Sequence, residues 1–251
     1  MRLCVLGSGS RGHAVYVEAG RTRVLFDAGF SGKQIRERLG SIGADLDDLS
    51  AIVISHEHTD HIAGLRVLGR KLPVYATRGT LSAIEDRFEL NGMEIIKPGD
   101  WCEIKDIKFL PVSLSHDANE PVGFVIEDGS SRAAVITDLG AVTNVVRHHL
   151  KDVALAVVES NHDAKMLRDG PYSWELKQRI KSRRGHLSNT QAANLVSAIA
   201  HPGLKQVMVA HLSEKNNLPE LAKGEAEAAL DGNNSKVQVC LQDAPTKVIR
   251  V

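Results

Sequence analysis

The side chains best suited to metal chemistry lie in one short segment of the chain. Three histidines and one aspartate occupy six positions there, shortly after the apolar run of residues 51–54. His56 and His58 are two residues apart, so on an extended chain their side chains project to the same side. Asp60 and His61 follow at once, before an apolar pattern that predicts a helix. Imidazole and carboxylate groups suit zinc and related divalent ions, so this segment predicts a metal-binding loop.

The pattern His-x-His-x-Asp-His resembles the signature of the metallo-β-lactamase-fold hydrolases. A lone His-x-His pair would be typical of a histidine-rich surface turn, whereas the full pattern at the end of a buried strand favours metal binding. Four ligands in one loop leave two metal ions short of partners. The resemblance therefore implies a further histidine, a bridging carboxylate and a last histidine later in the chain.

Three later residues complete this ligand set. His116, Asp138 and His211 each follow an apolar stretch that predicts a strand. Each alone is typical of an ordinary loop or turn, but α/β folds place their ligands at strand ends, and the order of the three matches the resemblance. The predicted ligands are His56, His58 and His116 for one ion, Asp60, His61 and His211 for the other, and Asp138 as the bridge between them.

Composition limits the functions that the chain can have. Of the 251 residues, 31 are basic and 31 acidic, so any surface that binds nucleic acid must be local. The three cysteines are far apart and form no Cys-x-x-Cys pair, which favours reduced thiols. No run approaches the ~20 apolar residues of a membrane span, and the chain opens on a strand pattern. We therefore expect a cytoplasmic protein without a membrane partner; its oligomeric state is not predicted.

The remaining patterns predict one α/β domain, residues 1–251, built as a four-layer αββα sandwich with the metals at one sheet edge. Residues 7–12 match Gly-x-Gly-x-x-Gly, but the dinucleotide-binding motif must open a helix, and β-rich residues follow here, so we expect a turn between strands with His13 in the loop. In the resembled superfamily, a carboxylate at Asp27 braces the metal loop. The predicted helices are 31–43, 62–71, 80–90, one from about 142, 173–184, 189–200 and 219–230.

A basic segment precedes the last part of the site. Residues 173–184 predict a helix that carries lysines and arginines on one face. Such a face is often only solvated. This helix, however, ends with a single residue, Gly185, between it and His186. A capping box of Ser188 and Gln191 then opens the next helix, whose N-terminus suits an anion. The residues predicted to bind substrate are Lys181, Arg184, Ser188 and Asn189.

A second resemblance is narrower. The strings Glu-Ser-Asn-His-Asp, Gly-Pro-Tyr and Gly-His-Leu-Ser-Asn, in this order, are similar to the YycJ/WalJ group of small metallo-β-lactamase-fold nucleases over nearly the whole chain. Members are cytoplasmic metal-dependent exonucleases with a 5′-to-3′ action on DNA. The Gly-His-Leu-Ser segment also resembles one in RNase Z, which implies that His186 steadies the phosphorane or protonates the leaving oxygen, oriented by Glu159. The group's N-terminal pattern is altered at Arg11 and His13.

We therefore predict a dinuclear-metal-dependent phosphodiesterase, specifically a 5′-to-3′ DNA exonuclease in which a metal-bridging hydroxide attacks phosphorus. Asp60 would hold the water and its ion, and His186 would act as general acid with Glu159 behind it. Histidine and carboxylate sites accept zinc, manganese or iron, and RNA stays open as a substrate beside DNA. The alternatives are a small-substrate hydrolase of the same fold, acting on a cyclic phosphodiester or a glyoxalase II-type thioester or lactone, and a non-catalytic metal-stabilised scaffold.

Overall fold

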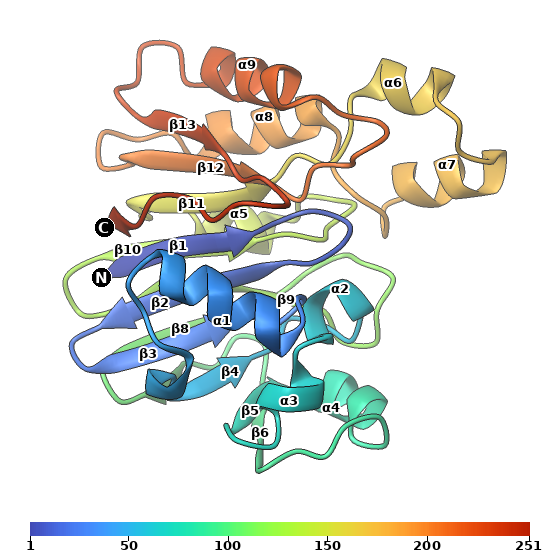
Figure 1. Ribbon diagram of the computed structural model, residues 1–251. Helices are drawn as coiled ribbons and strands as arrows, with labels where there is room; N and C mark the ends of the chain where they lie inside the picture. The colour runs from blue at the N-terminus through green and yellow to red at the C-terminus, as the bar shows by residue number, and fades with distance from the viewer.

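The computed structural model describes residues 1–251 and arranges them in four layers. Two seven-stranded sheets pack face to face, and helices cover both outer faces (Figure 1). The predicted α/β class and αββα sandwich are confirmed. None of the helices has both the length and the apolar content needed to cross a lipid bilayer.

The first sheet comes from the N-terminal half of the chain and the last strand. Its strands lie in the order β14 (Ile249–Arg250), β1 (Arg2–Gly7), β2 (Ala14–Ala19), β3 (Thr22–Phe26), β4 (Ala51–Val53), β5 (Val74–Thr77) and β6 (Met93–Ile96). Neighbours are antiparallel from β14 to β3 and parallel from β3 to β6. The helices of this half are α1 (Gly32–Ser41), the 3-10 helix η1 (Leu46–Asp48), α2 (Thr59–Ile62), α3 (Leu65–Leu68) and α4 (Arg78–Ile84).

The second sheet comes from the C-terminal half. Its strands lie in the order β13 (Lys236–Val239), β12 (Gln206–Ala210), β11 (Leu155–Glu159), β10 (Arg132–Ile136), β9 (Val122–Glu127), β8 (Ile107–Ser113) and β7 (Cys102–Ile104). Neighbours are parallel from β13 to β10 and antiparallel from β10 to β7. The helices of this half are α5 (Asn144–His149), α6 (Ala164–Asp169), α7 (Trp174–Lys181), α8 (Asn189–Ile199) and α9 (Pro219–Ala229).

Three apolar cores hold the layers together. Phe26, Phe109 and Phe124 meet between the sheets, with ring centroids 5.1–6.1 Å apart. Leu25, the neighbour of Phe26, belongs instead to the core under α1, because successive side chains of a strand point to opposite faces. A third core joins the second sheet to α8, which contributes Leu195 and other residues. Since both sheets share the central core, we propose that the chain is a single domain.

Several predicted elements have different bounds in the structure. The helix predicted over 62–71 is two short helices, α2 and α3, interrupted at Gly64. The Gly64 N–H donates to the Ala28 carbonyl at 2.7 Å, and a Cβ at Gly64 would lie 2.7 Å from the Phe30 carbonyl oxygen. The helix is therefore interrupted at Gly64, because the Gly64 N–H bonds to the loop that follows β3. The helix predicted over 80–90 corresponds to α4, which begins earlier, at Arg78, and ends earlier, at Ile84.

The basic helix predicted over 173–184 also ends earlier, at Lys181, where Ser182 adopts an extended conformation. Two other predictions hold. The Gly7–Gly12 segment joins β1 to β2 and opens no helix. Ser188 and Gln191 form the predicted capping box at the start of α8, each side chain accepting a hydrogen bond from the backbone of the other.

Candidate metal centre and active site

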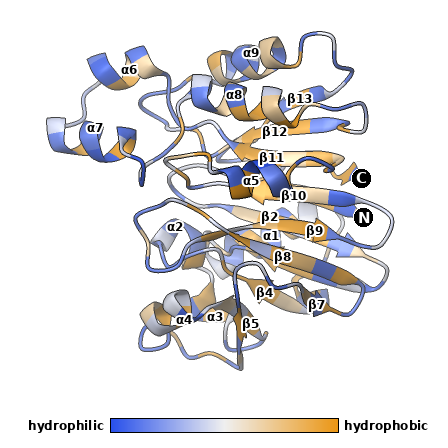
Figure 2. Ribbon diagram, turned by 180° about the vertical axis from the view of Figure 1, so that it is seen from behind, coloured by the Kyte–Doolittle hydropathy of each residue, from blue (hydrophilic) through white to orange (hydrophobic).

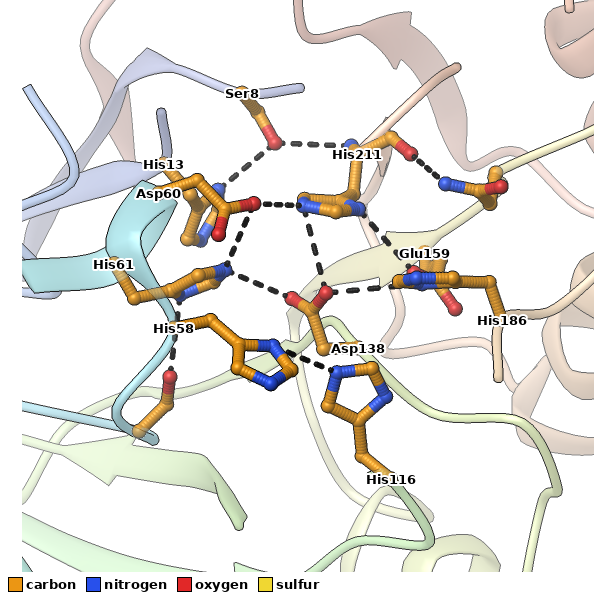
Figure 3. A network of polar contacts seen from close by, with 12 residues as sticks. Ser8, His13, His58, Asp60, His61, His116, Asp138, Glu159, His186 and His211 are labelled. Atoms are coloured by element: carbon orange, nitrogen blue, oxygen red, sulfur yellow. Dashed lines mark hydrogen bonds and ion pairs between the residues drawn. The ribbon is translucent and has the colours of Figure 1, made fainter. Parts of the chain in front are cut away.

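The predicted ligands converge at one end of the sandwich, where strands of both sheets end (Figure 3). The loop between β4 and α2 supplies His56 and His58, and α2 itself supplies Asp60 and His61. The segments after β8, β10 and β12 supply His116, Asp138 and His211. The C-terminal ends of parallel strands meet at the same edge of a sheet, so residues far apart in sequence become neighbours. The structure thus brings together the whole predicted set.

Sharp backbone turns direct several of these side chains inward. Asp27, Asp138 and His211 each follow a strand and adopt positive φ angles of 60°, 61° and 56°. Non-glycine residues seldom adopt this left-handed conformation, which costs of the order of 1–3 kcal/mol. Such strain is concentrated at functional sites, where the surrounding structure holds it in place.

The first ligand group contains His56, His58 and His116. One ligand atom from each residue lies within 4.8 Å of the others. His58 Nδ1 and His116 Nε2 are 3.3 Å apart, and the buried His56 Nε2 has no hydrogen-bond partner. Burial lowers the pKa of His56 and of His116, which favours the neutral imidazole that binds a metal.

The second group contains Asp60, His61 and His211, with Asp138 beside them. Asp138 Oδ2 lies 3.1 Å from His61 Nε2, and Asp138 Oδ1 lies 3.5 Å from His211 Nε2. Asp60 Oδ2 is 3.4 Å from the same His211 nitrogen. Burial alone would lower the pKa of His211, but the carboxylates of Asp138 and Asp60 outweigh it and raise this pKa to about 10. These carboxylates therefore favour a positive charge between them, either on the imidazole or on a bound cation.

The donor atoms fit divalent cations. Among the buried polar atoms without a hydrogen-bond partner are His56 Nε2, His61 Nε2, His211 Nε2 and Asp138 Oδ2. Buried polar atoms in proteins are nearly always hydrogen-bonded, so unpaired nitrogen and oxygen donors that face one another are typical of ligands. Asp138 belongs both to a group with His56 and His61 and to a group that contains His211, so its carboxylate lies within reach of residues from both predicted sets.

Asp27 and Ser55 orient the histidines from behind. Asp27 Oδ2 lies 2.8 Å from His61 Nδ1 and accepts a hydrogen bond from Ser55 Oγ at 2.9 Å. Ser55 Oγ is in turn 2.9 Å from His56 Nδ1. Partners on Nδ1 leave Nε2 of both rings for a metal, which is the usual arrangement behind metal-binding histidines. The position of Asp27 agrees with the bracing role that the resemblance implied.

His13 and Ser8 also support the centre, although the sequence indicated only a loop for His13. His13 is fully buried, and its ring centroid lies 5.4 Å from that of His61. Its Nδ1 is 2.8 Å from Ser8 Oγ, which accepts a hydrogen bond from the His211 N–H at 2.9 Å. Burial lowers the pKa of His13 to about 4. The altered N-terminal pattern at His13 was the only signal in the sequence for this role.

His186 and Glu159 form a pair beside the ligands. His186 Nδ1 lies 2.8 Å from Glu159 Oε1 and 3.7 Å from Asp138 Oδ1. Burial would lower the pKa of His186, but Glu159 outweighs it and raises this pKa, which favours the protonated ring. Glu159 is fully buried, and its Oε1 also lies 3.4 Å from His211 Nδ1. The pair is therefore linked to the second ligand group.

The four residues predicted to bind substrate have different surroundings. Asn189 is buried, and its Oδ1 accepts hydrogen bonds from Ser160 Oγ at 2.7 Å and from an asparagine amide, so its side-chain oxygen is engaged inside the protein. The Ser188 side chain caps α8. Arg184 Nε donates to the His116 carbonyl at 3.2 Å, which supports a ligand loop. Lys181 is exposed and lines a separate hollow.

A cavity of about 210 Å³ that opens to solvent is lined by His186 and by five of the predicted ligands, which are His58, Asp60, His116, Asp138 and His211. Comparison with known proteins identifies its family: the model of the beta-lactamase superfamily domain matches residues 22–212. The chain belongs to the beta-lactamase superfamily. The predicted resemblance is thereby confirmed.

Individual relatives of the superfamily agree with this assignment. Exodeoxyribonuclease YycJ of Bacillus anthracis is 37% identical over 236 residues, which cover 92% of this chain and 89% of the relative. Exodeoxyribonuclease WalJ of Streptococcus pneumoniae is 36% identical over 225 residues, covering 87% and 84%. The metallo-beta-lactamase fold protein YhfI of Bacillus subtilis superposes with a TM-score of 0.77 at 16% identity, covering 98% of both chains. The fold and the prediction of an enzyme are confirmed.

Proposed function

We propose that this protein is a cytoplasmic exodeoxyribonuclease that uses two divalent metal ions and degrades DNA from the 5′ end. One observation carries the proposal: two ligand groups meet at Asp138, and the His186–Glu159 pair faces the same cavity. A paired cation site with an adjacent proton donor suits phosphodiester hydrolysis. The identity to proteins named exodeoxyribonucleases supports DNA as the substrate.

Each set of residues has a defined task in this proposal. His56, His58 and His116 would hold one ion, Asp60, His61 and His211 the other, and Asp138 would contact both. Zinc, manganese or iron bound here would supply Lewis acidity. It would also lower the pKa of water enough for hydroxide, the nucleophile, to be available at neutral pH. The Asp60 carboxylate, which is partly exposed to the cavity, would orient the attacking water.

His186 and Glu159 would act on the opposite side of the phosphorus. The His186 ring lines the cavity while its Nδ1 is engaged by Glu159, so Nε2 is the atom that can reach the leaving oxygen. Transfer of a proton from Nε2 neutralises the alkoxide that forms as the phosphodiester bond breaks. Glu159 stabilises the protonated ring before transfer and fixes its orientation.

A basic hollow next to the active site supports a polynucleotide substrate. Arg147, Lys181 and Arg183 line it together with uncharged residues and without any carboxylate. The loop from Lys181 to Leu187 separates this hollow from the catalytic cavity, because Gly185 and His186 line the cavity while Leu187 lines the hollow. Unpaired cations beside a phosphodiester site attract the neighbouring backbone phosphates.

A labelled substrate panel tests the proposal. Single-stranded and double-stranded DNA, RNA, a cyclic phosphodiester and a thioester are each incubated with enzyme loaded with zinc or manganese. We expect 5′-labelled DNA to release its label as the smallest product from the first time point, while 3′-labelled DNA shortens progressively. His186→Ala should retain bound metal and lose turnover. Thioester hydrolysis with inert polynucleotides would contradict the proposal and favour a small-substrate hydrolase.

A further inference from the structure

The segment that carries α6 and α7 projects from the sandwich beside the active site (Figures 1 and 2). No residue of α7 is buried, which is unusual for a helix in a compact protein. Leu176 is 36% exposed although it lies on the side of α7 that faces the catalytic cavity. The packing of the protein itself therefore does not explain why α7 carries apolar residues on this side.

Those apolar residues form one wall of the catalytic cavity. Tyr172, Leu176 and Ile180 are the three apolar side chains among the fifteen residues that line it. Leu176 and Ile180 are four residues apart on α7 and therefore share one face of the helix, and Tyr172 lies just before its N-cap, Ser173. The remaining lining is polar or charged and contains ligands of both groups, such as His116 and His211. The cavity therefore has an apolar side and a side that attracts phosphate.

Contacts with a ligand loop hold this wall in place. Arg179 Nε donates to Asp117 Oδ2 at 2.5 Å, and Asp117 directly follows the predicted ligand His116. Ser115, on the other side of His116, donates its Oγ hydrogen to the Arg183 carbonyl at 2.6 Å. Helix α7 and the segment that follows it are therefore bonded to both neighbours of the predicted ligand His116, which holds the apolar wall beside the candidate metal centre.

We infer that Tyr172, Leu176 and Ile180 form a nucleobase subsite, which holds the base of the nucleotide whose phosphate reaches the metal centre. This inference rests on the proposed function. A nucleotide joins a flat apolar base to an anionic phosphate, and the two sides of the cavity match these two parts. An aromatic ring and aliphatic side chains accept any base, since every base has a π-face, so the subsite would favour nucleotides without selecting a sequence.

Oligonucleotides that lack one base test this subsite. A single abasic nucleotide is placed at the first or the second position from the degraded end, and KM and kcat are measured for wild type, Tyr172→Ala and Leu176→Ala. For the wild type we expect one of the two positions to raise KM by about 5- to 150-fold, the range for one base–aromatic contact. Tyr172→Ala should raise KM on intact DNA by a similar factor, and the abasic position should then add little.

Trp174 provides a matched control, because it lies on the same helix, is 71% exposed and does not line the cavity. Trp174→Ala should keep the wild-type response to the abasic position. Bound metal is measured for each variant to verify that the site is intact. Equal KM values for intact and abasic DNA in the wild type, or additive effects in Tyr172→Ala and Leu176→Ala, would overturn the subsite alone. No hydrolysis of either oligonucleotide by the wild type would overturn the proposed function with it.

Discussion

Replacing Glu159 by glutamine removes the negative charge that faces His186 and leaves the volume of the side chain unchanged. The carboxylate is fully buried, and its Oε1 lies 2.8 Å from His186 Nδ1. A hydrogen bond to a charged group contributes about 1.5–3 kcal/mol. Loss of this contribution in the transition state corresponds to roughly a 10- to 150-fold decrease in kcat. We therefore expect Glu159→Gln to lower kcat by this factor with little change in KM.

A double-mutant cycle shows whether Glu159 acts through His186. His186→Ala should lower kcat roughly 100- to 10,000-fold, the usual contribution of a general acid. If Glu159 only supports the histidine, the variant carrying both substitutions should be no slower than His186→Ala alone, because residues that act as a unit are not additive. Initial rates are measured on end-labelled DNA at saturating metal, and bound metal is determined for every variant.

Glu127 is the control for this cycle. It lies at the other end of the second sheet, on β9, where its Oε2 is 3.4 Å from Arg132 Nε. Glu127→Gln should leave kcat and bound metal unchanged. The reasoning would be refuted if the losses from Glu159→Gln and His186→Ala multiplied in the double variant. It would also be refuted if lost metal accounted for the whole effect of Glu159→Gln, since Glu159 also lies 3.4 Å from His211.

Three further predictions concern other parts of the molecule. A Cβ at Gly29 would lie 1.6 Å from the Asp60 carbonyl oxygen, so Gly29→Ala should abolish metal binding and lower Tm. At Gly40 an added Cβ meets nothing within 4 Å, so Gly40→Ala should change neither property. Metal analysis and thermal unfolding compare the two variants. Burial lowers the pKa of His162 from 6.5 to about 4, so the unfolded chain binds the extra proton and the wild type loses stability as pH falls from about 6.5 to 4. His162→Phe removes this group, and urea unfolding at pH 7.5 and pH 5 should show a smaller loss for the variant; an equal loss would contradict the assignment. Lys181→Glu in the basic hollow should raise KM for DNA and reduce the slope of log KM against log salt by about 1 or more, and an unchanged slope would exclude a phosphate contact there.

The sequence indicated which side chains gather at one end of the sandwich, because most of the candidate ligands follow an apolar strand. His116, Asp138 and His211 were grouped with His56 because each follows an apolar strand and their order matches the resemblance to the metallo-β-lactamase-fold hydrolases. Their left-handed or sharply turned backbones were not predictable from spacing. The position of His13 beside the site was missed because its contact with His61 joins the loop after β1 to helix α2, and no local pattern reports such a contact.

Element ends and the surroundings of single polar side chains were predicted less well, for reasons that depend on tertiary structure. The basic helix ends at Lys181 because the chain must turn to bring Gly185 against Gly140, where an added Cβ would lie 2.4 Å from the Gly185 nitrogen. Asn189 follows a helix cap and was therefore expected to face substrate. In the structure its amide donates to Asn217 Oδ1 at 2.9 Å inside the protein. Burial of a single polar side chain depends on partners that are distant in sequence.

The central claim is that two cations share Asp138. Anomalous X-ray diffraction from crystals grown with zinc, recorded above and below the zinc absorption edge, tests it most directly. The account predicts two neighbouring anomalous peaks, one among His56, His58 and His116 and one among Asp60, His61 and His211, with the Asp138 carboxylate in contact with both. A single peak, or zinc bound elsewhere with these side chains free of metal, would contradict the account.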